Sequence, residues 1–287
     1  MTASDELDRA SQLPRAGSTF AGRFSLVRRL AAGGMGAVFE ATDAAGTAVA
    51  IKVLHPELAS DTEIRRRFRR ESSILAAIDH PGVVRILDMG TDDRGRSFTV
   101  MELLQGETLA EWMERSGALS PEELRPVVHQ VCDALSAVHG HGVVHGDLKP
   151  ANLFLVEEGE GRVAKLVDFG LSKVHGLDRL TRTGEVIGTP AYMAPELLTG
   201  DGVPDGRVDT YALGVILYEA LANAKPFTER NPGKLMFEIV MGKNIPLTQH
   251  GVAPEVAEVV ERAMAASRDK RFPTTKELGD AFEAVSQ

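Results

Sequence analysis

The stretch VVHGDLKPANLF, residues 143–154, places three polar side chains at a fixed spacing between apolar flanks that predict strands. These side chains are Asp147, Lys149 and Asn152, and Gly146 stands directly before the aspartate. A carboxylate, an amine and an amide on one loop are a candidate catalytic group. The chemistry of the loop, and the reason for the glycine, depend on the motifs that surround it.

Composition sets the outer limits. The chain has 287 residues, which suffices for one large domain or for two lobes with sizeable cores. It is 43% hydrophobic and 25% charged, as is usual for a globular protein. The formal net charge of −9 argues against a nucleic-acid partner, because neutralising phosphates needs a basic face.

The single cysteine, Cys132, excludes an intrachain disulfide and favours a reducing, cytoplasmic location. It lies in an apolar helical pattern, which predicts a packed core thiol rather than a reactive one. No apolar run reaches the roughly 18 residues that span a bilayer, and residues 211–221 read as a buried helix. Residues 1–22 are polar, lack the features of a signal peptide, and are expected to form a flexible lead-in.

The pattern changes along the chain. From Phe24 to about Met101, short apolar or alternating runs predict strands, interrupted by one helix that Asp61 would cap. From Thr108 onward helices dominate, and Ser120 begins one that would end near Gly140. The expected fold class is therefore α+β. A small strand-rich lobe covers 23–101, a larger, mainly helical lobe covers 102–287, and a cleft between two such lobes is a usual ligand site.

A glycine-rich turn lies between the first two predicted strands of the small lobe. The sequence LAAGGMGAVFEA runs from Leu30 to Ala41 and contains Gly33, Gly34 and Gly36. Backbone without Cβ atoms can approach a phosphate closely and direct N–H groups at it. Taken alone, the turn is equally consistent with an ordinary hairpin.

Lys52 follows in the run TAVAIKVLH. A two-residue period places Ala50 and Lys52 on one face and Val49, Ile51 and Val53 on the other. A small residue beside a lysine suits the wall of a nucleotide cleft, although a solvated lysine on an edge strand is the alternative.

Glu71 falls on the apolar stripe of the predicted helix, three residues after Phe68 and four before Leu75. A carboxylate there is costly unless it is paired, and Lys52 is the expected partner.

The run LVDFG, residues 166–170, delivers Asp168 from an apolar strand into a turn. Asp168 and Asn152 together supply hard oxygen ligands of the kind that Mg²⁺ uses, with water and phosphate oxygens completing the shell.

These motifs, in this order, resemble those of eukaryotic-type (Hanks-type) bacterial serine/threonine protein kinases over about residues 24–285. The matching runs are GGMGAV, VAIK, the helix glutamate Glu71, HGDLKPAN, DFG, GTPAYMAPE, DTYALGV and Arg271 in DKRF. The resemblance implies a bilobal kinase fold, with one kinase domain over 23–285, and an enzyme that uses ATP with Mg²⁺ or Mn²⁺.

The resemblance also assigns roles. It implies that Asp147 accepts the proton of the substrate hydroxyl, or orients that hydroxyl, and that Lys149 neutralises the transferring phosphoryl group. Asn152 and Asp168 would hold the metal, and Lys52, positioned by Glu71, would clamp the α- and β-phosphates.

The implied nucleotide-binding residues comprise the turn, the adenine pocket and the hinge: Leu30, Gly33, Gly34, Gly36, Val38, Ala50, Lys52, Met101, Glu102, Leu104 and Phe154. The resemblance further implies a stacked apolar column of Leu75, Ile86, His145 and Phe169. It implies that Asp209 anchors the catalytic loop and that Glu196 and Arg271 form a buried ion pair.

Two residues depart from the family pattern. Ala31 replaces the first glycine of the turn, which is tolerable if its φ is negative. Gly146 stands where most family members have an arginine that pairs with a phosphorylated activation segment. Turnover is therefore expected not to require phosphorylation at Thr181, Thr183 or Thr189. Thr181 and Thr183 remain candidate autophosphorylation sites, whereas Thr189 is expected to help orient the substrate.

Two other functions stay open. HGD also occurs in small-molecule phosphotransferases such as those that modify aminoglycosides, although such enzymes have no need of the segment that ends in APE. A catalytically dead scaffold would usually lack one of the four key residues, all of which are present: Lys52, Asp147, Asn152 and Asp168. The expected partners are ATP, protein substrates with Ser or Thr acceptors, and a second copy in a transient homodimer for trans-autophosphorylation. No nucleic-acid partner and no membrane segment are expected.

Overall fold

The computed structural model describes residues 13–33, 36–56, 58, 61–159, 161–169 and 190–286. The chain divides into two compact units, one of residues 1–79 with 84–104 and the other of residues 80–83 with 105–287. The main division thus falls between Leu104 and Gln105, a few residues after the boundary at 101/102 expected from sequence.

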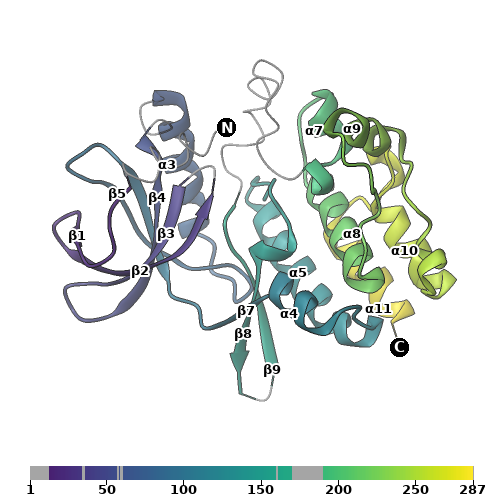
Figure 1. The fold of residues 1–287 in the computed structure, drawn as a ribbon, viewed down its shortest axis with the longest axis horizontal. Coiled ribbons are helices and arrows are strands. Elements are labelled where there is room, and N and C mark those ends of the chain that lie inside the picture. Colours follow the sequence, from purple (N-terminus) through teal and green to yellow (C-terminus); the bar gives the residue numbers. More distant parts are fainter. Residues whose placement is uncertain are drawn as a thin grey trace. The chain divides into compact units, whose positions relative to one another are not determined.

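The first unit is built on a six-stranded antiparallel sheet in the order β1-β2-β3-β4-β6-β5 (Figure 1). The strands are β1 (Thr19–Phe20), β2 (Phe24–Gly33), β3 (Gly36–Thr42), β4 (Ala48–Leu54), β5 (Ile86–Thr91) and β6 (Ser97–Glu102). Val49, Ile51 and Val53 are buried in one apolar cluster with residues of β2, β3 and β6. The alternation predicted for β4 is confirmed.

Helix α3 (Thr62–Ala76) packs against β5 in the first unit. The Asp61 side chain accepts hydrogen bonds from the backbone N–H groups of Glu63 and Ile64, so the predicted N-cap is confirmed. Phe68 and Leu75 are buried on the inner face of this helix.

The segment before residue 23 differs from the expectation of a lead-in that is flexible throughout. Leu13 and Phe20 are buried, and β1 pairs with the start of β2. The Phe20 ring packs edge-on against Phe98, with ring centroids 5.1 Å apart. Apolar side chains at positions 13 and 20 thus belong to the core of the first unit, although the surrounding sequence is polar.

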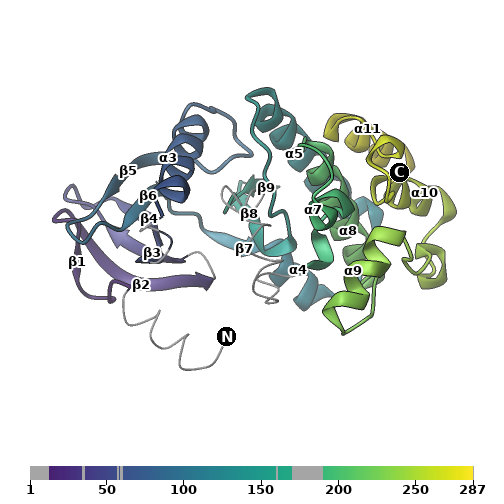
Figure 2. The ribbon, with the colours of Figure 1, turned by 90° about the horizontal axis from the view of Figure 1, so that it is seen from above.

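The second unit is mainly helical and carries a three-stranded antiparallel sheet in the order β7-β8-β9. Its elements are β7 (Gly106–Thr108), α4 (Leu109–Ser116), α5 (Pro121–Gly140), η1 (Pro150–Asn152), β8 (Leu153–Glu158), β9 (Gly161–Leu166), η2 (Pro190–Tyr192), α7 (Pro195–Thr199), α8 (Arg207–Ala222), α9 (Pro232–Met241), η3 (Leu247–His250), α10 (Pro254–Ala263), η4 (Arg268–Lys270) and α11 (Thr275–Val285). Figure 2 shows α5, α8, α10 and α11 packed together.

Helix α8 is buried over almost its whole length, as the apolar run 211–221 predicted. Helix α5 begins at the predicted cap, where Ser120 and Glu123 form a reciprocal capping box. Within the described residues, no helix is both long enough and apolar enough to cross a bilayer.

Cys132 lies on α5 and is 2% exposed, which confirms the predicted core thiol. A Cβ atom at Gly279 of α11 would lie 3.0 Å from the Cβ of Cys132, so the two helices approach closely at this glycine. Burial, followed by the charge of Asp280, raises the pKa of the Cys132 thiol to about 12.

This thiol is therefore expected to resist modification in the native protein at pH 8. Only the thiolate is nucleophilic, and at pH 8 a small fraction of this thiol is ionised and its sulfur is buried. The measurement uses an aromatic disulfide that releases a coloured product when a thiol attacks it. It should detect one reactive thiol per chain in denaturant and almost none in the folded protein. Rapid labelling of the folded protein would contradict the packed position.

Candidate active site

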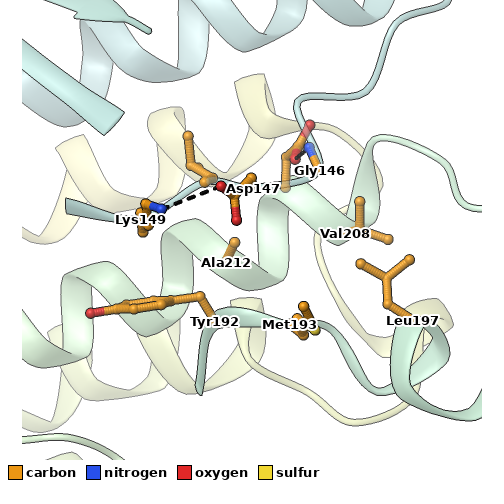
Figure 3. A pocket seen from close by; sticks show the side chains of 10 residues that line it. Gly146, Asp147, Lys149, Tyr192, Met193, Leu197, Val208 and Ala212 are labelled. Carbon is orange, nitrogen blue, oxygen red and sulfur yellow. Dashed lines mark hydrogen bonds and ion pairs between the residues drawn. The ribbon is translucent and has the colours of Figure 1, made fainter. Parts of the chain in front are cut away.

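The loop between α5 and β8 brings three of the predicted catalytic residues together. The Nζ atom of Lys149 lies 3.3 Å from Oδ2 of Asp147, and Figure 3 shows the two side chains facing each other. The Nδ2 atom of buried Asn152 donates to the backbone carbonyl of Asp147 at 2.8 Å. The short helix η1 turns the chain between Lys149 and Asn152, so the amide folds back under the aspartate. A carboxylate and an ammonium group are thus held side by side.

Asp209, in the first turn of α8, holds the backbone of this loop. Its Oδ2 accepts from the N–H of His145 at 2.8 Å, and its Oδ1 accepts from the N–H of Gly146 at 2.9 Å. These two contacts confirm the anchoring role expected for Asp209, which lies three residues after the N-cap of α8, Gly206. A charged acceptor on two successive backbone donors fixes the peptide just before Asp147.

A third donor to Asp209 comes from His139 near the end of α5, whose Nε2 lies 2.8 Å from Oδ2. The His139 ring packs on Gly206, where an added Cβ would lie 2.6 Å from Nδ1. Sequence reasoning missed this residue. Its spacing of six before His145 has no local meaning, because the contact joins residues 70 positions apart.

His145 is fully buried, and burial lowers the pKa of its imidazole, so the ring is neutral. Its Nε2 lies 3.1 Å from the carbonyl of Val167 and its Nδ1 lies 3.4 Å from the N–H of Asp147. These partners assign the proton to Nε2, because a carbonyl only accepts. The ring also stacks on Phe169 with centroids 4.5 Å apart, as expected for that part of the apolar column.

Gly146 has a φ of +69°, in the left-handed region that favours glycine. The conformation that lets its N–H reach Asp209 is therefore one that glycine adopts without cost. The absence of the arginine side chain thus coincides with a backbone geometry that suits glycine.

The predicted metal ligands also lie close together. The Nδ2 of Asn152 is 3.5 Å from the backbone carbonyl of Asp168, which has a φ of +57°. Positive φ in a non-glycine residue is a strained conformation of the kind that clusters at functional sites. A carboxylate and an amide oxygen are donors that fit Mg²⁺. Among the described residues no group of three or more His, Cys, Asp or Glu forms a separate metal site.

Beside the catalytic loop, Tyr192 of η2 donates a hydrogen bond from its hydroxyl to the carboxylate of Glu219 on α8. Burial and this bond raise the pKa of the Tyr192 phenol, which stays protonated. A small cavity of about 20 Å³ lies under the loop between Tyr192 and α8 (Figure 3). A larger pocket of about 650 Å³ is lined by Lys149, Pro150, Tyr192, Glu219 and residues of α4. Sequence reasoning missed the Tyr192–Glu219 contact.

The predicted nucleotide residues of the first unit share a sheet face. Val38 is the register partner of Lys52, and Ala50 is the partner of Met101. Register partners point to the same side of a sheet, so these four side chains lie opposite the apolar cluster. Ala50 is buried, whereas Lys52 and Val38 are half-buried.

The remaining predicted residues lie as follows. Leu30 is exposed on β2, and Glu102 ends β6, where its carboxylate accepts from the N–H of Arg85 at 2.9 Å. Leu104 is half-buried, as are Glu71 on α3 and Phe154 on β8 of the second unit. The Lys52–Glu71 pair and the complete adenine pocket stay predictions. Gly34, Thr181, Thr183 and Thr189 lie outside the described residues.

The glycine-rich turn joins β2 to β3, with Gly33 and Gly36 as the closing register pair. Ala31 is not among the described non-glycine residues with positive φ, so the condition for tolerating alanine there is met. Gly36 has a φ of +157°, and an added Cβ would lie 1.9 Å from the carbonyl oxygen of Val53. At Gly33 an added Cβ would meet nothing within 4 Å.

Gly36→Ala is therefore expected to destabilise the protein by about 3 kcal/mol, because the methyl group forces β3 and β4 apart. Gly33→Ala is the matched control, with an expected change within about 0.5 kcal/mol. Urea unfolding of both variants measures the difference. Equal stability of the two would show that the close approach of β3 to Val53 is not required.

A buried ion pair joins Glu196 of α7 to Arg271, which directly follows η4. The guanidinium of Arg271 donates to both carboxylate oxygens of Glu196, each at 2.7 Å, and the Arg271 side chain is 0% exposed. It also donates to the backbone carbonyls of Ala265, Ala266 and Arg207. The predicted pair is confirmed.

The second unit holds a loop with a carboxylate, an amine and an amide, anchored to a buried helix. The first unit holds a glycine-rich turn and a lysine on its sheet. This set of features defines the class of protein kinases. The protein kinase domain family matches residues 24–282. Serine/threonine-protein kinase PknA of Mycobacterium tuberculosis is 36% identical over 277 residues, or 95% of this chain and 63% of PknA. Serine/threonine-protein kinase pkn2 of Myxococcus xanthus is 35% identical over 92% of this chain and 32% of its own length.

Among solved structures, the PknI kinase domain of Mycobacterium tuberculosis superimposes with a TM-score of 0.73 at 30% identity, covering 94% of this chain and 99% of the other. The chain belongs to the protein kinase domain family and is a serine/threonine protein kinase domain of the Hanks type found in bacteria. It spans less than two thirds of the length of these two curated relatives.

Proposed function

We propose that this domain transfers the γ-phosphoryl group of ATP to serine or threonine hydroxyls of proteins. The observation that carries the proposal is the group of Asp147, Lys149 and Asn152 on a loop whose backbone is held by Asp209. Asp147 accepts the proton of the substrate hydroxyl, or orients that hydroxyl, and Lys149 compensates the charge of the transferring group. Little covalent chemistry is needed, because placement and charge compensation supply most of the rate.

Asn152 and Asp168 would hold Mg²⁺ or Mn²⁺. When bound, that ion neutralises the phosphate oxygens and orients them. In the first unit, Lys52 binds the α- and β-phosphates, positioned by Glu71, and Gly33 and Gly36 leave room for phosphate to approach the backbone. Val38, Ala50 and Met101 contact the adenine ring from the same sheet face as Lys52.

The acceptor is a polypeptide segment that lies along the pocket beside Lys149. The pocket has a volume of about 650 Å³, which supports a substrate larger than a single side chain. Residues of α4, α8 and η2 line it, so it offers an extended contact surface. Tyr192 and Glu219 fix one wall of this pocket through their hydrogen bond. We also propose that a transient homodimer carries out trans-autophosphorylation, and that the domain works in the cytoplasm, where a single cysteine is ordinary.

Intact-mass analysis tests the function. The wild-type protein is incubated with ATP and Mg²⁺, alone and with a generic basic protein acceptor, and phosphorylated residues are mapped. Added phosphate on serine or threonine is the expected result. ATP consumption with transfer only to a small alcohol would favour a small-molecule phosphotransferase, and nucleotide binding without any transfer would favour a scaffold.

Gly146 leads to a separate prediction about activation. Because glycine offers no guanidinium to pair with a phosphate, the double variant Thr181→Ala/Thr183→Ala is expected to keep most of its turnover on a peptide substrate. The measurement is kcat for this variant and for phosphatase-treated wild type. If both the double variant and the phosphatase-treated wild type lost turnover, a group other than residue 146 would have to bind the phosphorylated threonine.

A further inference from the structure

His55 contacts the backbone at the start of the glycine-rich turn. It follows directly after β4, is 8% exposed, and its Nε2 lies 3.0 Å from the carbonyl oxygen of Gly33. Gly33 is the last residue of β2. The contact therefore joins two strands that are not neighbours in the sheet, since β3 lies between them.

The register explains how one side chain spans this distance. Gly36 at the start of β3 pairs with Gly33 on one side and with Leu54 on the other. Its missing side chain allows β3 to approach Val53 closely. His55 is one residue beyond Leu54, so it lies beside the end of the β2–β3 hairpin. With no side chain at Gly36 between them, the imidazole ring contacts Gly33.

The chemistry of the contact fixes its direction. A carbonyl oxygen only accepts, so Nε2 of His55 carries the proton and donates it. The carbonyl of Gly33 is held in place, and with it the peptide that closes the β2–β3 hairpin. Glycine loses more conformational freedom on ordering than other residues, so a side chain that restrains Gly33 before the ligand arrives reduces the entropy lost on binding.

We propose that His55 is a positioning residue for the nucleotide phosphates, acting through the backbone of Gly33. The inference rests on the proposed function, in which the backbone of this turn binds phosphate. It assigns His55 no contact with the nucleotide. The competing explanation is a histidine that only stabilises the fold, and that role would affect all ligands of the first unit equally.

Binding of ADP with Mg²⁺ and binding of adenosine separate these roles, because only ADP has phosphates. Calorimetric titration compares the wild type with His55→Leu, which keeps an apolar body without a donor, and with His55→Gln, whose amide N–H can replace Nε2. His55→Leu is expected to weaken ADP binding roughly three- to tenfold, the size of one hydrogen bond, and to leave adenosine binding unchanged. His55→Gln should recover most of the loss. The KM for ATP should rise by the same factor with little change in kcat.

If His55→Leu fails to fold, the comparison uses His55→Asn, whose shorter amide does not reach Gly33, against His55→Gln. Equal ADP affinity in those two variants, or equal weakening of ADP and adenosine in His55→Leu, overturns the proposal. A wild type that binds ADP no more tightly than adenosine would instead refute the phosphate-binding role of the turn, and with it the proposed nucleotide site. If the wild type binds ADP more tightly than adenosine, and the His55 variants keep the same ratio of affinities, only the role of His55 is refuted.

Discussion

Asp147→Asn is expected to lower kcat for phosphorylation of a serine peptide by about 100- to 10,000-fold with the fold intact. Asparagine has the same shape but neither the negative charge that faces Lys149 nor the basicity to take a proton. The loop should keep its conformation, because Asn152 donates to the backbone of Asp147 and Asp209 holds the two preceding N–H groups. Steady-state kinetics measures kcat, and thermal unfolding of the same preparation shows whether the fold is intact.

Asp280→Asn is a matched control for this substitution. Asp280 lies on α11, its side chain is 59% exposed, and its partner is the surface residue Lys276. The same chemical change there should leave kcat and the melting temperature close to the wild-type values. Unchanged kcat in Asp147→Asn would refute the role assigned to the carboxylate.

The elements that sequence predicted well are those with local signals. The alternating faces of β4, the Asp61 cap of α3 and the capping box at Ser120 each depend on residues within a few positions of one another. The long-range contacts of Asp209 and Arg271 were also predicted, but only through the resemblance to a family. For Asp209 and Arg271, composition and periodicity contain no information about which groups these buried side chains meet.

The parts that sequence did not predict are contacts between distant residues, because no motif specifies which residues meet. His139 reaches Asp209, and Tyr192 reaches Glu219, in each case between elements that meet only in the folded unit. Leu13 and Phe20 stand in a polar segment too short for periodicity to register, yet both are buried. The φ of Gly146 likewise depends on where Asp209 lies.

Glu196→Ala is expected to destabilise the protein by about 3–5 kcal/mol, the usual cost of leaving a buried charge without its partner. The Arg271 side chain is 0% exposed and cannot turn to water, and its three backbone carbonyl contacts supply partial charges rather than a full one. For a domain of this size the loss corresponds to a melting temperature lower by roughly 10 °C.

Two comparisons show whether the expected loss of stability comes from burial of the charge or merely from loss of an ion pair. Asp280→Ala breaks an exposed pair and should cost less than about 1 kcal/mol. The double variant Glu196→Met/Arg271→Met removes both buried charges and is expected to be more stable than Glu196→Ala alone, because no unpaired charge remains in the interior. If Glu196→Ala were as stable as Asp280→Ala, the carbonyl groups of Ala265, Ala266 and Arg207 would suffice for the guanidinium.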